Sequence, residues 1–235
     1  MQLTKNTNDM KSPFILPVSV TGFGAFAIAL GLMTSPLNAS DKDDQAKKDS
    51  GQPDMEAMMK KMQELAAPGP EHKALALLAG EWEAEAKCSM MGADTVNKGS
   101  CTKKMILGGR YLKEEFDGEM MGNKFHGISI TGYDKFNKKF VNNWIDDMGT
   151  GFFVSEGTAD ADFKAFTLEG KMDDPATGEK QKSMRLLTRI VSPDKHMFEM
   201  HDLSLGDKSK VMEITYTRKA GSAAGSLSTT GREKP

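Results

Sequence analysis

Asn142, Trp144 and Asp146 form the stretch of this sequence whose residue types best fit a binding site. They alternate along a predicted strand in step with Phe140, so the four side chains are expected on one face of a sheet. Asn and Asp are poor strand formers, which makes their presence here unusual. A cavity wall with an aromatic side and hydrogen-bonding groups explains the pattern. A strand end at which Asp146 caps the turn at 147–149 explains it equally well.

Glu114 is a second candidate, because it shares the predicted inward face of its strand with Leu112 and Phe116. A buried carboxylate needs a partner. A structural salt bridge or a misplaced strand boundary is preferred here over a functional role. The same need for a donor applies to an inward Asp146, for which Arg110 or a ligand is a candidate. An acid–base pair of Glu114 and Asp146 would require both to point inward, and nothing in the sequence places them within reach of each other.

The two cysteines, Cys88 and Cys101, come out roughly opposite if 81–90 and 99–107 form a hairpin with its loop near 93–95. Cross-strand neighbours lie close to the spacing that a disulfide requires, so a Cys88–Cys101 bridge is a possible feature. Two free thiols packed as small apolar residues are the equal alternative. A metal site is not expected, because no Cys-x-x-Cys motif or histidine partner is nearby.

Methionines at helical spacing raise the question of copper, since thioether sulfur is a soft ligand that suits Cu(I). They are Met55, Met58, Met59 and Met62. A flexible apolar helix face explains the same spacing and is preferred. The histidines His126, His196 and His201 lack metal-binding spacing, and there is no Gly-rich phosphate loop or Gly-x-Ser-x-Gly elbow. No cofactor is therefore expected, and a binding protein is favoured over an enzyme.

The N-terminal region has the layout of a secretory signal, with lysines before an apolar run at 14–33 and small residues near Ala39. We expect residues 1–39 to be a signal peptide and the protein to be periplasmic or extracellular. An uncleaved membrane anchor at 14–33 is the alternative, and it is the only membrane contact expected. The formal net charge of −2 does not suggest a nucleic-acid partner. The oligomeric state is not predicted.

The spacing of the hydrophobic residues divides the rest of the chain into four segments. Residues 40–53 are charged and aperiodic, which predicts a disordered linker. Two short helices are predicted within 54–79, ending at Gly80. From Glu81 the period changes to two, and about ten strands follow with short connections and no helices between them. This pattern predicts an all-β domain at 80–219, a single antiparallel up-and-down β-barrel that removes its own sheet edges by closing. The Gly/Ser/Thr-rich segment 220–235 is predicted to be a disordered tail.

A helix followed by Gly80-Glu81-Trp82 at the start of the first strand resembles the calycin superfamily, which includes the lipocalins. The chain also resembles the uncharacterised bacterial family called domain of unknown function 1579. That resemblance lies in PGPEHKAL at 68–75, LAGEW at 78–82, MILGGRYL at 105–112, GYDKF at 132–136, WIDDMGTG at 144–151 and VMEITYTRK at 211–219. It implies a calycin-like barrel and carries no family catalytic residues.

Barrels of this size enclose a packed core or one small ligand. Small inward residues such as Ala84, Ala86, Gly127 and Ser129 would leave room, so we expect a small apolar or amphipathic ligand. The ligand-binding candidates are Trp144, Asp146, Asn142, Glu114 and Trp82. A solid-core structural or interaction protein and Met-based Cu(I) handling are the alternatives.

Overall fold

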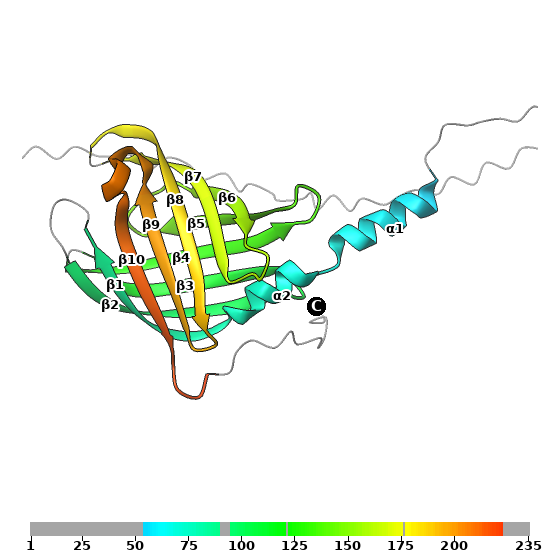
Figure 1. Cartoon of the computed structure of the whole chain (residues 1–235), viewed down its shortest axis with the longest axis horizontal. Coiled ribbons are helices and arrows are strands. Elements are labelled where there is room, and N and C mark those ends of the chain that lie inside the picture. The colour runs from blue at the N-terminus through cyan, green and yellow to red at the C-terminus, as the bar shows by residue number, and fades with distance from the viewer. Residues whose placement is uncertain (1–53, 90–94, 121, 176, 223–235) are drawn as a thin grey trace, which may run out of the picture. The chain divides into compact units, whose positions relative to one another are not determined.

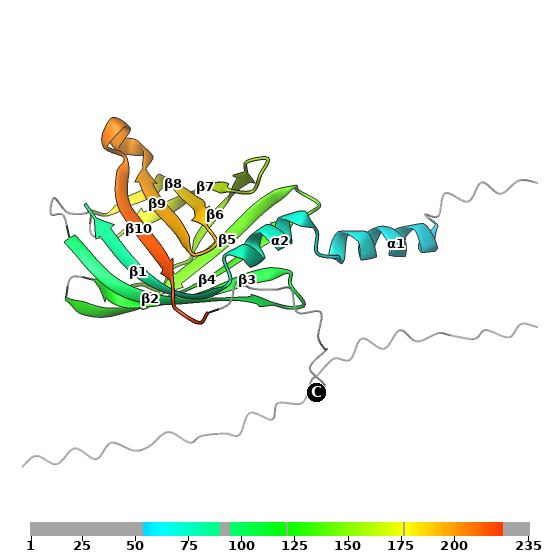
Figure 2. The same ribbon diagram turned by 60° about the horizontal axis from the view of Figure 1, so that its bottom comes forward.

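The computed structural model describes residues 54–89, 95–120, 122–175 and 177–222. Over these residues the chain forms a closed barrel of ten antiparallel strands, in which each strand pairs with its neighbours in sequence and β10 pairs with β1 (Figures 1 and 2). The strands are β1 (Gly80–Cys88), β2 (Thr95–Ile106), β3 (Tyr111–Met120), β4 (Asn123–Asp134), β5 (Lys139–Asp146), β6 (Phe153–Ala159), β7 (Ala165–Asp174), β8 (Glu179–Ser192), β9 (Lys195–Asp202) and β10 (Lys210–Arg218). The predicted all-β, up-and-down barrel is confirmed.

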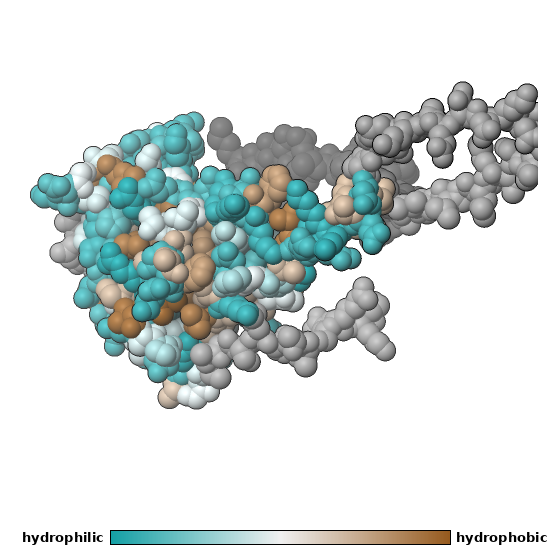
Figure 3. Space-filling view, turned by 45° about the vertical axis from the view of Figure 1, so that its right-hand side comes forward, coloured by the Kyte–Doolittle hydropathy of each residue, from teal (hydrophilic) through white to brown (hydrophobic). Residues whose placement is uncertain are grey.

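The strand alternation seen in the sequence sets which side chains face the interior. In β1, Trp82, Ala84 and Ala86 are buried, while Glu83 and Glu85 between them are exposed. Successive side chains of a strand point to opposite faces, so one face builds the core and the other meets the surroundings. The surface in Figure 3 is accordingly mostly hydrophilic, with small groups of hydrophobic residues among the polar ones.

Two helical segments precede the barrel. α1 (Met55–Ala66) begins at Asp54, whose side chain accepts a hydrogen bond from the Glu56 N–H at 3.0 Å, and α1 has no buried residue. α2 (Pro70–Leu77) starts with proline, which suits the first turn of a helix because proline has no N–H to satisfy. Leu75 is almost fully buried, and α2 contacts β2, β3 and β4. Figure 1 shows α2 at the end of the barrel where β1 begins.

Connections after odd-numbered strands lie at the opposite end of the barrel from α2, because neighbouring strands run antiparallel. This second end includes the segment between β5 and β6, the segment between β7 and β8, and η2 (Leu203–Lys208), a 3₁₀ turn between β9 and β10. The two ends of the barrel therefore differ, since a helix covers only the first.

Trp82 and Arg218 join the first and last strands of the barrel. They are paired across β1 and β10, and the Arg218 guanidinium lies 4.0 Å from the centre of the Trp82 ring. Arg218 donates hydrogen bonds to the carbonyls of Ala79 (2.8 Å), Leu77 (3.3 Å) and Pro193 (2.8 Å). Trp82 Nε1 donates to the Leu78 carbonyl at 3.0 Å. One cation–π contact and several hydrogen bonds thus tie the last strand to the junction of α2 and β1.

Of the two alternatives for the cysteines, the Cys88–Cys101 disulfide is wrong and the two free thiols are confirmed, with Cys101 buried and Cys88 half-buried. The pairing of β1 with β2 places Cys88 opposite Thr95 and Cys101 opposite Trp82. Six residues separate Trp82 from Cys88 along β1, which puts the thiols roughly 20 Å apart at the rise of a strand. The hairpin loop begins earlier than the sequence suggested, since β2 already starts at Thr95.

The predicted signal peptide at 1–39, the linker at 40–53 and all but 220–222 of the tail lie outside the described residues. Within the described part of the chain, no helix is long and apolar enough to cross a membrane. The four methionines of α1 are exposed by 42–63%, so core packing within the described chain does not account for their spacing.

We expect Arg218→Gln to lower the free energy of unfolding by about 2–4 kcal/mol, because it removes an almost fully buried guanidinium that lies over the Trp82 ring and donates to three carbonyls. Arg185→Gln is the matched control. Arg185 is largely exposed, and its bond to Glu169 is a surface ion pair worth at most about 1 kcal/mol. Urea unfolding of the two variants measures the difference, and equal losses would show that Arg218 does not hold the barrel closed.

Candidate functional site

A cavity of about 970 Å³ occupies the barrel interior. Leu75 and Leu78, at the C-terminal end of α2, line its closed end, which we call the floor. Residues 148–152, between β5 and β6, line its other end together with residues of the β7–β8 connection. We call this second end the mouth.

Aromatic and methionine side chains are the largest apolar groups of the cavity wall. The aromatic residues are Phe116, Phe125, Phe140, Trp144, Phe152, Phe153, Phe166, Phe198 and Tyr216, and the methionines are Met120, Met148, Met172, Met200 and Met212. Flexible thioether side chains adapt to irregular apolar shapes, and rings supply large rigid surfaces. The wall is therefore suited to an apolar molecule.

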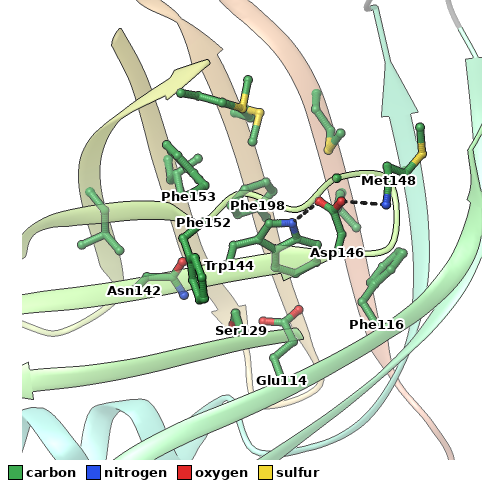
Figure 4. Close-up of a pocket in the computed structure, with 18 of the residues that line it drawn as sticks. Glu114, Phe116, Ser129, Asn142, Trp144, Asp146, Met148, Phe152, Phe153 and Phe198 are labelled. Atoms are coloured by element: carbon green, nitrogen blue, oxygen red, sulfur yellow. Dashed lines mark hydrogen bonds between the residues drawn. The ribbon is translucent and has the colours of Figure 1, made fainter. Parts of the chain in front are cut away.

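Trp144 and Asp146 both line the cavity, as the sequence predicted, and they contact each other directly (Figure 4). Trp144 Nε1 donates to Asp146 Oδ2 at 2.7 Å, and the Met148 N–H donates to Asp146 Oδ1 at 3.0 Å. Asp146 thus belongs to the cavity wall and also caps the turn that follows β5, so the two alternative explanations are both correct. The expected partner Arg110 is wrong: its guanidinium donates instead to the carbonyls of Leu107 and Ala66.

Gly127 of β4 gives the Trp144 ring its place. The two residues are on neighbouring strands, and a Cβ atom at Gly127 would overlap the indole. The expectation that Gly127 leaves room for a ligand is therefore wrong, because Trp144 fills that space. Of the other small residues in that expectation, Ala86 and Ser129 line the cavity, whereas Ala84 is buried in the core and does not line it.

Asn142 lies on the same wall, where its Nδ2 donates to Thr131 Oγ1 at 2.8 Å across the β4–β5 pair. Trp82 is different, because it does not line the cavity. It is 1% exposed and packs edge-on against His196, at 4.3 Å between ring centres. Its assignment as a ligand-binding residue is therefore wrong, since its role is to hold the barrel closed.

Glu114 reaches the cavity and takes part in a buried polar cluster near the floor. Its Oε2 lies 3.3 Å from Lys103 Nζ, and its Oε1 accepts hydrogen bonds from Cys101 Sγ (3.2 Å) and Tyr216 Oη (3.4 Å). Lys103 Nζ also lies 3.1 Å from His196 Nε2. The structural salt bridge proposed for Glu114 is thus present.

His196 is held neutral in this cluster. Lysine can only donate, so Nε2 is the acceptor and the proton is on Nδ1, a buried atom with no hydrogen-bond partner among the described residues. Burial, and then the positive charges of Lys103 and Arg218, lower the pKa of His196 far below its ordinary value. Burial and the Glu114 carboxylate raise the pKa of the Cys101 thiol and of the Tyr216 hydroxyl. Neither group is therefore prepared for ionisation chemistry.

The structure does not join Glu114 and Asp146 as an acid–base pair, because each carboxylate is bound by its own set of donors. Within the described residues, no group of three or more His, Cys, Asp or Glu side chains is arranged to hold a metal ion. The arrangement can enclose an apolar molecule and orient it through a few polar groups.

Sequence reasoning missed Lys103 and the grouping of His196 with Tyr216. Lys103 is two residues from Cys101 in β2, so the strand period already put both on one face. A lysine on a strand face that otherwise points inward was the feature of the sequence that could have identified Lys103 as a buried polar residue. Its partners lie on β3, β9 and β10, and only the closed barrel brings these strands together.

We expect the free energy of unfolding to fall as the pH drops below about 6.5, the ordinary pKa of histidine. Above that pH, His196 is neutral in both states. Below it, the unfolded chain takes up a proton that the folded chain refuses, which costs up to about 1.4 kcal/mol per pH unit. Urea unfolding between about pH 7 and pH 5 measures this slope.

His196→Gln should remove this part of the slope, whereas His126→Gln, at a partly exposed histidine, should keep it. Wild-type stability that stays constant down to about pH 5 would contradict the assignment of a buried neutral His196.

Comparison with known proteins gives this chain a family but no activity. No curated protein matches the sequence. Among solved structures, a redesigned β-barrel is similar at 12% identity and a TM-score of 0.34, over 62% of this chain and 95% of that one. The family model described as "Protein of unknown function (DUF1579)" matches residues 67–218, which include α2 and all ten described strands. The chain therefore belongs to the DUF1579 family.

Proposed function

We propose that this protein is an exported β-barrel that binds one small, mostly apolar molecule in its interior. The observation that carries this proposal is the cavity of about 970 Å³, which α2 closes at one end and whose wall includes many aromatic, methionine and leucine side chains. Cavities that bind small molecules in proteins commonly measure about 300–1,000 Å³. The volume is at the upper end of that range, which supports a ligand rather than a solid core.

The polar groups of the wall support a ligand with a polar part. Asn142 and Ser129 lie part-way along the cavity, Asp146 is nearer the mouth, and Glu114 is nearer the floor. A few polar groups in an apolar pocket orient a ligand and select among ligands of similar size. An amphipathic molecule therefore fits better than a plain hydrocarbon.

The wall is largely formed before any ligand binds. Trp144 is fixed by its bond to Asp146 and by stacking on Phe125, with ring centres 6.2 Å apart. Phe140 packs against Tyr133 at 4.9 Å and against Phe166 at 5.1 Å. A preformed pocket avoids the ordering cost that a flexible site would add to binding.

Export is the second part of the proposal, and the N-terminal sequence supports it. Lysines, the apolar run at 14–33 and the small residues near Ala39 have the order of a secretory signal. A binding protein in the periplasm or outside the cell would meet molecules taken up or released by that cell. An anchor at 14–33 would place the same barrel at the membrane surface.

A bound molecule should be detected by native mass spectrometry of the purified protein and lost after organic extraction. The extracted protein should then bind the apolar dye N-phenylnaphthylamine. Ala86→Phe should weaken dye binding by about tenfold or more, because the new ring occupies part of the cavity that Ala86 lines.

Glu85→Phe is the matched control, since Glu85 is the neighbouring exposed residue of β1 and the same ring would point outward. Equal dye affinity in Ala86→Phe, Glu85→Phe and the wild type would place the dye outside the barrel. If the extracted wild type binds no dye and no adduct is found, the binding proposal fails.

Expression of the full chain in a bacterial host should yield a mature protein that starts just after Ala39, because a signal peptidase cleaves after small residues. N-terminal sequencing of the protein released from the periplasm measures this. Ala39→Leu should block the cleavage, and Ala57→Leu, far from the site, should not. An intact N-terminus in the membrane fraction would instead support the anchor.

A further inference from the structure

Asp146 places a carboxylate on the cavity wall whose two hydrogen bonds come from neutral donors, the Trp144 indole and the Met148 backbone. No lysine or arginine of the described residues forms an ion pair with it. Glu114, nearer the floor, is different, because Lys103 neutralises it. The charge at Asp146 is therefore available to a bound molecule.

Aromatic rings surround this carboxylate. Figure 4 shows Asp146 between Trp144 and Phe116, with all three directed into the cavity. Asp146 and Phe116 are both paired with Gly127, so the strand between them carries no side chain at that row. Phe125 stacks on Trp144 from the same side of the barrel. Ring faces carry negative charge density and attract cations.

The mouth does not offset the carboxylate with positive charge. Among its described residues, four acidic side chains (Glu119, Asp173, Asp174 and Glu179) and three lysines (Lys98, Lys171 and Lys180) line the cavity, and Lys182 beside them pairs with Asp174 and Glu179. These charges balance, so the mouth carries no excess of positive charge. Inside the cavity, away from the lysines of the mouth, an anionic ligand would meet either Asp146 with its aromatic neighbours or Lys103, which is already bonded to Glu114 and His196. Both positions are unfavourable for a negative head group.

Resting on the proposed function, we infer that the ligand class is an amphipathic amine. Its ammonium group binds the Asp146 carboxylate against the faces of Trp144 and Phe116, and its apolar body occupies the aromatic and methionine wall. A cation in a partly desolvated site of this kind gains both a charge-assisted hydrogen bond and a cation–π contact.

Decylamine, decanol and decanoate test this inference, because they share one alkyl chain and differ only in the head group. Calorimetric titration of the extracted wild-type protein should rank the amine first. We expect it to bind about tenfold or more tightly than the alcohol, the scale of one hydrogen bond to a charged group. Decanoate should bind more weakly than the alcohol.

Asp146→Asn should remove the preference for the amine while leaving decanol affinity nearly unchanged. Asp147→Asn is the matched control, because it removes the same charge from an exposed neighbour on the opposite face of the chain. It should keep the preference. Trp144→Phe keeps a ring but no indole N–H, and should retain part of the preference.

The outcomes separate the two proposals. Binding of all three compounds without preference for decylamine, or preference for decanoate, overturns the amine inference while the binding function stands. Retention of the full preference in Asp146→Asn overturns the role of that carboxylate. Absence of binding for all three, together with no dye binding, overturns the binding function and this inference with it.

Discussion

Pairing of β1 with β10 is the constraint on which the rest of this structure depends. It joins the two strands that are farthest apart in the sequence, and without it the interior would be one face of an open sheet. Trp82 and Arg218 stand at the end of that pairing, where the guanidinium lies over the indole and bonds the carbonyls behind it. A closed sheet has no free edge, so every strand is satisfied on both sides and the interior becomes an enclosed space.

The two ends of that space are chemically different. Near the floor, Lys103 pairs with Glu114 and contacts His196, and Tyr216 donates to Glu114, so the two charges of the cluster neutralise each other. A buried polar cluster of this kind tolerates few changes, because removal of one member leaves the others unpaired in a region of low dielectric constant. Toward the mouth, Asp146 has no ion-pair partner among the described residues, and its two neutral donors orient it. The two ends of the cavity therefore differ in the polar groups that a ligand would meet.

Trp144 connects the architecture to the candidate site. Its ring occupies the space that Gly127 leaves open, its indole N–H fixes Asp146, and its face stacks on Phe125. A single aromatic residue therefore helps to fill the core, forms the wall and orients a charged group. Trp144 thus packs in the core and also lines the cavity, which explains why the 142–146 stretch fits both a cavity wall and a strand end with a capped turn.

Strand period, fold class and the inward row of Asn142, Trp144 and Asp146 could be predicted from the sequence, because alternation is a local property of the extended backbone. The register between strands could not be predicted, as the cysteines show. Because β2 begins at Thr95, the residue opposite Cys101 is Trp82 and not Cys88. The polar cluster near the floor could not be predicted either, because Lys103 and His196 are 93 residues apart in the sequence and meet only in the closed barrel. Local geometry decides which way a side chain points, whereas pairing between distant strands decides what it meets.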